Sequence, residues 1–348
     1  MPVVCSRVPL CLGALLVLAS ACSGPAESGD TAPAEAPRCE ATGAMDDVLT
    51  VPDVQALGTH NSYHVEPDTL FDASHAYTQP PLDVQAGVGV RAFELDVHLG
   101  DDGVFRVFHL PAIDDVSTCD TLGGCLGVLR TWSLAHPCHS PLTVWIEPKD
   151  DIDAAVEGLV PLAGHLAEMD DAITAAWPRE RLIPPDDVRG DRATVPEGVA
   201  AGWPSLADAR GKLLLAMLDD GEARAEYLTG APALEGRVLF VNSDTAADPF
   251  AATFKIDDAP GNAAQVGELV AAGFLVTSNV DSAGDDDATN TARFEASLAA
   301  GPNNLASDQV VAVEGEAYVA ALPGGAPRCH PARVPAGCGA DVIEPAAR

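Results

Sequence analysis

Lysine is scarce in this sequence of 348 residues. Only Lys149, Lys212 and Lys255 are lysines, and 52 acidic residues outnumber 19 lysines and arginines, so the formal net charge is −33. A surface with this excess of negative charge repels the phosphates of nucleic acids and of anionic lipid headgroups. The composition therefore argues against nucleic acid as a partner and against direct binding of the chain's own surface to anionic membranes.

Long apolar segments are also absent after the N-terminal region. Residues 1–21 contain one charge, Arg7, and a short apolar core at Val8–Ala19. This core is too short to span a bilayer, and the pattern predicts an export signal that is removed from the mature protein.

Cys22 follows this signal in a context that resembles the processing site of a bacterial lipoprotein. The Ser-, Gly-, Pro- and Ala-rich tract behind it cannot bury a core and predicts a flexible linker over residues 22–45. We therefore expect an exported protein that is anchored to a membrane by lipid on Cys22, in the periplasm or at the cell surface. The alternative is an ordinary signal cut near Ala21, which would give a secreted protein.

No Cys-x-x-Cys pair occurs, and the mixture of Cys and His is too sparse to indicate zinc. Once Cys22 is set aside, an even number of cysteines beyond the signal suits disulfides in an exported protein: Cys39, Cys119, Cys125, Cys138, Cys329 and Cys338. Cys119 and Cys125 bracket a short Gly-rich loop and are the best candidate pair. Cys329 and Cys338 pair with each other, or one of them pairs with Cys39.

Apolar runs alternate with helical segments along the mature chain, which predicts a parallel α/β sheet. The predicted strands lie at 54–60, 90–99, 142–147, 212–218, 237–241, 252–256, 274–277 and 304–306. The predicted helices lie at 122–135, 151–169 continuing to 177, 262–272 and 289–300, and the Pro-rich stretch 178–204 is expected to be a long connection. About eight strands predict closure into a TIM-type (β/α)8 barrel over residues 46–322, followed by a Cys-containing tail at 323–348.

The segment from Val90 to His109 carries the most informative pattern. Val90–Leu99 alternates with period two, so Glu94 and Asp96 project from the same face of one strand. A turn signal at Asp101–Gly103 precedes a second short strand that ends at His109. Carboxylates that point together repel each other and resist desolvation, so a bound cation is their expected partner.

Two further predicted strands end in residues that can carry chemistry. Val54–Gly58 leads into His60 and Asn61, and Leu142–Ile146 leads into Glu147. In TIM-type barrels the active site lies at the C-terminal ends of the strands, so these residues are expected to converge. The oxygen donors at these ends suit a hard cation such as Ca²⁺ better than zinc: Asn61, Glu94, Asp96 and Glu147.

Four segments resemble the signature of the bacterial calcium-dependent phosphoinositide-specific phospholipase C family: Gly58–His64, Glu94–Asp96, Phe108–His109 and Glu147–Asp150. Segments 80–91 and 202–219 resemble the approaches to further strands of that family, so the resemblance covers roughly residues 50–310. The resemblance implies a monomeric PLC-like phosphodiesterase barrel that uses Ca²⁺ to cleave a phosphoinositide or a related phosphodiester.

The resemblance also implies roles for individual residues. His60 and His109 are the implied catalytic pair, and Asn61, Glu94, Asp96 and Glu147 are the implied Ca²⁺ ligands. Attack of an inositol hydroxyl on phosphorus needs a base, an acid for the leaving alcohol and positive charge at the phosphate. We expect His109 to be the general acid, His60 to donate to the phosphoryl oxygens, and Glu94 or Glu147 to be the base.

Other polar residues have weaker claims. Lys149 follows Glu147 by two positions and is a candidate to bind phosphate, or else a charge at the rim of the barrel. Five other histidines are expected at the rim or in solvent: His64, His75, His98, His136 and His139. Where bacterial members of the family tend to carry arginines in a late strand, this chain has Val276–Asp281. Losing these bidentate phosphate partners puts phosphatidylinositol itself in doubt more than the phosphodiester chemistry.

Two alternative functions stay open. One is a phosphodiesterase on the same barrel that acts on glycerophosphodiesters. The other is a non-catalytic, lipid-tethered binding protein that keeps a degenerate active site.

Overall fold

The computed structural model describes residues 39, 45–153, 155–315, 317–334, 338 and 340–344. The predicted export signal at residues 1–21 and the predicted lipidation site at Cys22 lie outside these residues. Within the described ranges, no helix combines the length and the apolar character needed to cross a membrane.

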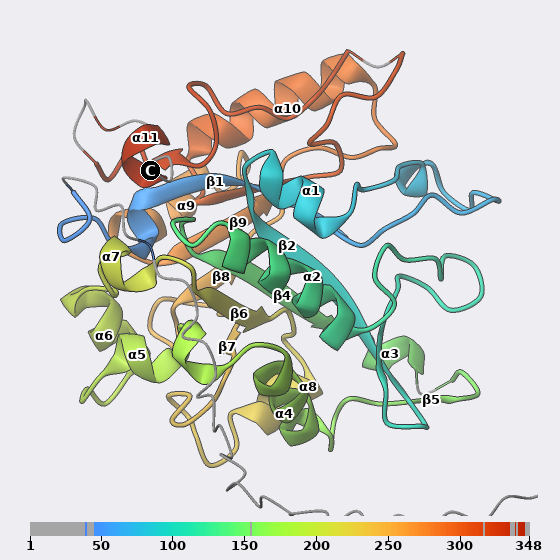
Figure 1. Ribbon diagram of the computed structural model, residues 1–348, viewed down its shortest axis with the longest axis horizontal. Coiled ribbons are helices and arrows are strands. Elements are labelled where there is room, and N and C mark those ends of the chain that lie inside the picture. Colours follow the sequence, from blue (N-terminus) through green and yellow to red (C-terminus); the bar gives the residue numbers. More distant parts are fainter. Residues whose placement is uncertain are drawn as a thin grey trace, which may run out of the picture. The chain divides into compact units, whose positions relative to one another are not determined.

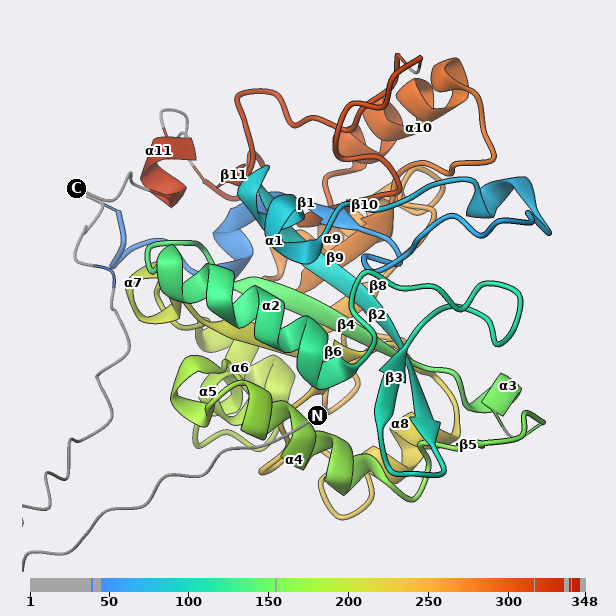
Figure 2. The ribbon, with the colours of Figure 1, turned by 45° about the vertical axis from the view of Figure 1, so that its right-hand side comes forward.

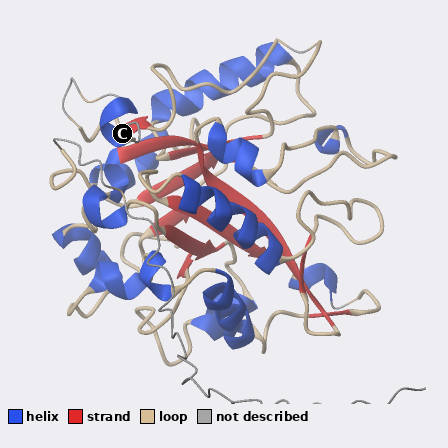
Figure 3. Ribbon diagram, viewed as in Figure 1, coloured by secondary structure: helices blue, strands red, loops and turns tan. Residues whose placement is uncertain are grey.

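A nearly closed barrel of parallel strands forms the centre of the fold, with helices on its outside (Figure 1 and Figure 3). Within the described residues its eight strands follow this spatial order: β7 (Phe240–Val241), β6 (Leu213–Met217), β4 (Leu142–Pro148), β2 (Val90–Gly100), β1 (Val54–Thr59), β10 (Asn304–Ser307), β9 (Leu275–Asn279) and β8 (Thr253–Lys255). A parallel bridge between Asn242 and Thr253 brings β7 and β8 together. The predicted TIM-type barrel is confirmed.

Helices lie between the strands of the barrel. They are α1 (Leu82–Gly87), α2 (Leu122–Ala135), α3 (Asp150–Asp153), α4 (Leu166–Ala176), α5 (Pro185–Arg189), α6 (Val195–Ala201), α7 (Leu206–Ala209), α8 (Glu222–Tyr227), α9 (Ala263–Ala271) and α10 (Asp287–Ala300). Helix α2 buries an apolar face, because Leu122, Leu126 and Leu129 repeat at helical spacing and are fully buried. The side chain of Thr121 accepts a hydrogen bond from the backbone N–H of Gly124 and caps its N-terminus.

Strand β2 is longer than its neighbours and forms the predicted hairpin. Beyond the barrel it pairs in antiparallel fashion with β3 (Phe105–Val107) and with β5 (Leu159–Val160), as Figure 2 shows. Inside the barrel β2 pairs in parallel with β4, in a register that places Asp96 opposite Glu147. This register therefore sets two of the predicted site residues, Asp96 and Glu147, side by side on adjacent strands.

Two predictions about helices are wrong. The helix expected over residues 151–169 is divided into α3, β5 and the start of α4, because Gly158 and Gly164 adopt φ angles of 86° and 89°, which an α-helix does not allow. The Pro-rich stretch 178–204 is not an irregular connection but contains α5 and α6. Proline lies in the first turn of both helices, where its missing N–H costs no hydrogen bond.

Three disulfides and a C-terminal segment are added to the barrel within the described residues. The predicted Cys119–Cys125 bond is present, Cys329 pairs with Cys338, and Cys39 pairs with Cys138 and not with either C-terminal cysteine. Strand β11 (Arg328–Cys329) pairs with the start of β1, and α11 (Ala340–Ile343) follows it. The predicted limits of the barrel, 46–322, and of the tail, 323–348, stay predictions.

Candidate active site

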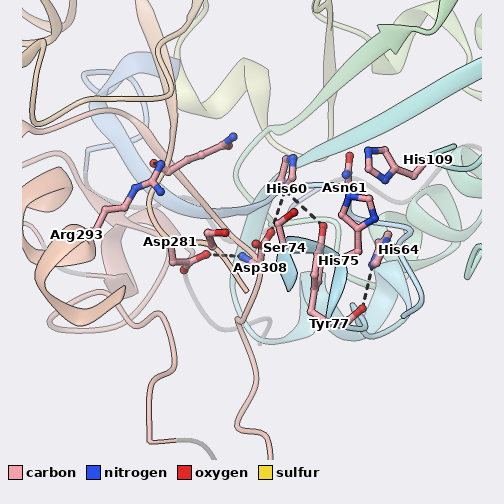
Figure 4. A pocket seen from close by; sticks show the side chains of 12 residues that line it. His60, Asn61, His64, Ser74, His75, Tyr77, His109, Asp281, Arg293 and Asp308 are labelled. Carbon is pink, nitrogen blue, oxygen red and sulfur yellow. Dashed lines mark hydrogen bonds and ion pairs between the residues drawn. The ribbon is translucent and has the colours of Figure 1, made fainter. Parts of the chain in front are cut away.

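The loops that follow β1, β3, β9 and β10 surround a pocket of about 210 Å³. Figure 4 shows the side chains that line it: His60, Asn61, His64, Ser74, His75, Tyr77, His109, Asn279, Asp281, Ser282, Arg293 and Asp308. Three residues predicted from the sequence, His60, Asn61 and His109, therefore meet at one pocket. It lies at the C-terminal ends of the strands, as expected for a barrel of this class.

Three predicted carboxylates lie together beside this pocket. Glu94 and Asp96 on β2 and Glu147 on β4 each place an oxygen within 4.8 Å of the others. Glu94 and Asp96 are buried, while the side chain of Glu147 is 31% exposed. The acidic face of β2 is therefore not a wet surface, and a cluster of this charge needs cationic partners.

Two of the three lysines of the chain supply part of this positive charge. Lys149 Nζ lies 2.7 Å from Asp96 Oδ2 and 2.6 Å from Glu147 Oε1. Lys255, which the sequence did not single out, is buried on β8 and forms an ion pair with Glu94 across the barrel. Burial disfavours a charged lysine, but the carboxylates outweigh it and raise the pKa of both lysines. Lys149, predicted to bind phosphate or to lie at the rim, binds the carboxylates in this structure.

The carboxylate cluster has the properties of a cation site. Asp96 is fully buried, and its Oδ1 receives no hydrogen bond from any residue that the structure describes. Burial raises the pKa of Asp96 to about 7 in spite of Lys149, and the charges of Glu147 and Glu94 add to this effect. Three carboxylates also exceed the two ammonium groups that contact them. A divalent ion with a preference for oxygen donors, such as Ca²⁺, fits this donor set.

His60 is held as a cation at the edge of this cluster. Asn61, which follows it, adopts a φ of 39° and turns the chain away from β1. His60 Nδ1 lies 2.9 Å from Asp308 Oδ1, and its Nε2 lies 3.7 Å from Glu94 Oε1. Burial alone would lower the pKa of His60, but Asp308 and then Glu94 outweigh burial and raise the pKa to about 9. At neutral pH His60 therefore carries a positive charge into the pocket.

His109 differs from His60 in its charge. Its Nδ1 lies 2.7 Å from Asp114 Oδ2. Burial lowers the pKa of His109 to about 4, and the positive charge of Lys149 adds to this effect, while Asp114 opposes it. At neutral pH the substrate-free ring is neutral, with Nδ1 donating to Asp114 and Nε2 left to exchange a proton.

The prediction that the other histidines lie in solvent or at the rim is largely wrong. His64, His98 and His139 are buried, His75 is partly buried, and His136 is exposed as expected. His64 and His98 bond carboxylates that are distant in sequence, Asp114 and Asp153, which periodicity cannot reveal. His98, for example, bonds Asp153 Oδ1 at 2.5 Å and stacks on Phe108.

Several pocket residues escaped the sequence reasoning. Asp281 and Asp308 follow β9 and β10, and their position after a strand was the available signal. Asp308 bonds His60, and Asp281 accepts hydrogen bonds from the Asp308 backbone at 2.7 Å and from Tyr318 at 2.6 Å. Arg293 on α10 lies in no motif, yet its guanidinium lines the pocket and supplies a cation that the late strand lacks.

A sequence model of one known family matches this chain. The family is described as phosphoinositide phospholipase C, Ca²⁺-dependent, and the match covers residues 98–331, about two thirds of the chain. His109, Glu147 and Lys149 lie inside this range, whereas His60 and Glu94 precede it. No curated protein matches the sequence significantly.

Solved structures of bacterial enzymes have a similar fold. A Ca²⁺-dependent phosphatidylinositol-specific phospholipase C from Streptomyces antibioticus is 23% identical, with a TM-score of 0.55 over 75% of this chain and 95% of that enzyme. A calcium-dependent phosphoinositol-specific phospholipase C from a Gram-negative Pseudomonas species is 16% identical, with a TM-score of 0.53 over 77% and 93% of the two chains. At these identities the likeness supports the barrel fold and nothing finer.

Asp96→Asn tests whether the carboxylate cluster binds Ca²⁺. The substitution keeps the shape of the side chain and removes one charge, so we expect Ca²⁺ affinity to fall by about tenfold or more, measured by calorimetric titration. Asp101→Asn, in the exposed turn of the β2–β3 hairpin, is the matched control and should leave the affinity unchanged. Equal affinity in both variants would contradict the assignment of the site.

Proposed function

The chain belongs to the Ca²⁺-dependent phosphoinositide phospholipase C family, and from this premise we propose that it cleaves a phosphoinositide by attack of an inositol hydroxyl on phosphorus. The observation that carries the proposal is the carboxylate cluster beside two histidines, one cationic and one neutral. Such a set provides a metal site, a cation for the phosphate and a separate group for proton exchange.

Asn61, Glu94, Asp96 and Glu147 would hold the Ca²⁺. When bound there, the ion lowers the pKa of the attacking hydroxyl and neutralises charge on the phosphate. His60, as a cation, donates to a phosphoryl oxygen. Glu94 is buried and engaged by both Lys255 and His60, whereas Glu147 is more exposed and is engaged by Lys149, so we assign Glu147 as the carboxylate that accepts the hydroxyl proton.

His109 delivers a proton to the leaving alcohol in this proposal, as the sequence predicts. An imidazolium with a pKa of about 4 is a stronger acid than an ordinary histidine, but the ring is unprotonated at neutral pH. The anionic phosphodiester in the pocket favours the charged ring and so raises the pKa of His109 on binding. Without this effect, a neutral His109 would act as a base instead.

The charges around the pocket favour an inositol ring without further phosphates. An adjoining pocket of about 700 Å³ shares Tyr77, Asp281 and Asp308 with the first, and Asp285–Asp287 also line it. These carboxylates repel additional phosphate groups, and Arg293 is the arginine that lines the first pocket. We therefore propose phosphatidylinositol, or its soluble headgroup diester glycerophosphoinositol, as the substrate class.

The loops beside the pocket also support a lipid substrate. Leu70 and Phe71 precede His75 in one loop, and Ile113 and Val116 flank Asp114 in another, and all four side chains are exposed. Apolar side chains at the mouth of a pocket can contact acyl chains without any positive surface charge. We further propose export and lipidation of Cys22, which would hold this acidic barrel near a bilayer.

Product analysis tests the proposed function directly. We expect the protein to release a cyclic inositol phosphate from phosphatidylinositol in the presence of Ca²⁺ and to be inactive in excess chelator, measured by phosphorus NMR. Release of glycerol phosphate and free inositol from glycerophosphoinositol, with no cyclic intermediate, would favour a glycerophosphodiester phosphodiesterase. Binding without turnover would favour the non-catalytic alternative.

His109→Ala tests the role of the second histidine. We expect turnover to fall by about a hundredfold or more, the usual scale for loss of a general acid. A substrate whose leaving group needs no protonation, such as a nitrophenyl ester of inositol phosphate, should lose less. Equal losses on the two substrates would show that His109 is not the acid.

Cys22→Ser tests the anchor. If Cys22 is acylated, the wild-type protein should partition with membranes and the variant should be released or remain unprocessed, as seen by fractionation and by the mass of the N-terminal peptide. The released form should lose activity on membrane-embedded substrate, because charge repulsion acts over about 8 Å at physiological salt, and keep it on glycerophosphoinositol. An unmodified mature N-terminus would indicate simple secretion.

A further inference from the structure

One buried carboxylate gathers three histidines at the side of the pocket opposite Asp308. Asp114, in the loop after β3, is 1% exposed. Its Oδ2 lies 2.7 Å from His109 Nδ1, 3.0 Å from His64 Nε2 and 3.3 Å from His75 Nδ1. Figure 4 shows the three rings together, away from Asp281 and Arg293.

The hydrogen bonds of His64 require a cation between His64 Nε2 and Asp114 Oδ2. His64 Nδ1 lies 2.9 Å from the backbone carbonyl oxygen of Tyr77, which can only accept, so Nδ1 carries the proton of the neutral ring. The lone pair of Nε2 then faces Asp114 Oδ2, a second acceptor, at 3.0 Å. Two acceptors at this distance repel each other unless a proton or a metal ion lies between them.

A second observation points to a metal ion. Asp114 Oδ1 is buried and has no hydrogen-bond partner among the described residues, so this carboxylate keeps an unused donor oxygen. The His64 Nδ1–H bond to a backbone carbonyl is also the arrangement that usually orients a metal-binding histidine. Ligand atoms of His64, His109 and Asp114 lie within 4.8 Å of one another.

We propose that His64, His109 and Asp114 form a second metal site, selective for a Zn²⁺-class cation, with His75 as a further ligand. Two or three imidazole nitrogens and one carboxylate oxygen suit a borderline transition metal in four-coordinate geometry, whereas Ca²⁺ requires oxygen donors. The two sites differ in donor chemistry: carboxylates on strands at one, imidazoles on loops at the other.

Occupation of this site inhibits the phosphodiesterase, a consequence that rests on the proposed function. In the neutral ring Nδ1 carries the proton and donates it to Asp114, so a metal ion would bind Nδ1 only after this proton has moved to Nε2, and the hydrogen bond to Asp114 would be lost. The ring then keeps a single proton on Nε2 and no longer cycles between imidazole and imidazolium. Zn²⁺ would therefore suppress turnover while Ca²⁺ stays bound.

Co²⁺ titration of the protein in saturating Ca²⁺ tests the site without any assay of activity. We expect one equivalent of Co²⁺ to produce the visible ligand-field absorption of a four-coordinate site and Zn²⁺ to displace it. His109→Ala should abolish the absorption, and His75→Ala should weaken Co²⁺ binding by about tenfold. His165→Ala, on the exposed N-terminal end of α4, and Asp96→Asn should not change the titration.

Absence of this absorption in the wild-type protein, or its persistence in His109→Ala, would overturn the proposal. Loss in His109→Ala with no effect of His75→Ala supports the site with three protein ligands. A separate assay of phosphoinositide cleavage distinguishes failure of the two proposals. Co²⁺ binding without cleavage refutes only the proposed function, and Ca²⁺-dependent cleavage without Co²⁺ binding refutes only the second site.

Discussion

Repulsion among three neighbouring carboxylates is the constraint on which the site depends. The parallel register of β2 and β4 places Asp96 opposite Glu147, and Glu94 lies on the same face of β2. Like charges on paired strands destabilise a sheet, and burial raises the cost. Two of the three lysines of the chain offset this cost, Lys149 directly after the strand that carries Glu147 and Lys255 across the barrel.

The barrel interior below the cluster is polar in part and holds the strands in register. Trp145 Nε1 on β4 donates to Thr277 Oγ1 on β9, and Asn304 on β10 donates to the same hydroxyl. β1 approaches its neighbours closely at Gly58, where an added Cβ would lie 3.1 Å from Ala92 Cβ. These contacts fix the heights at which the strands end, and therefore the relative positions of His60, Glu94 and Glu147.

Sequence reasoning found the site residues that lie on strands or directly after them. The alternation of β2 and the polar residues that end β1 and β4 were enough to bring His60, Asn61, Glu94, Asp96 and Glu147 together. It missed partners from distant segments: Asp308 lies 248 residues from His60, and Lys255 lies 161 residues from Glu94. It also placed His64 in solvent, because burial of a loop residue depends on the packing of another loop and leaves no periodic trace.

The different charge states of His60 and His109 follow from the balance between burial and the neighbouring charges at each ring. Asp308 bonds one imidazole, and Glu94 adds a second negative charge within 3.7 Å, so His60 keeps its proton. Asp114 serves three imidazoles at once, and the positive charge of Lys149 also acts on His109. At His109, burial together with Lys149 outweighs Asp114, and this ring is left neutral. The loop after β3 therefore acts on the charge of the His109 ring through Asp114, the carboxylate that it places against Nδ1.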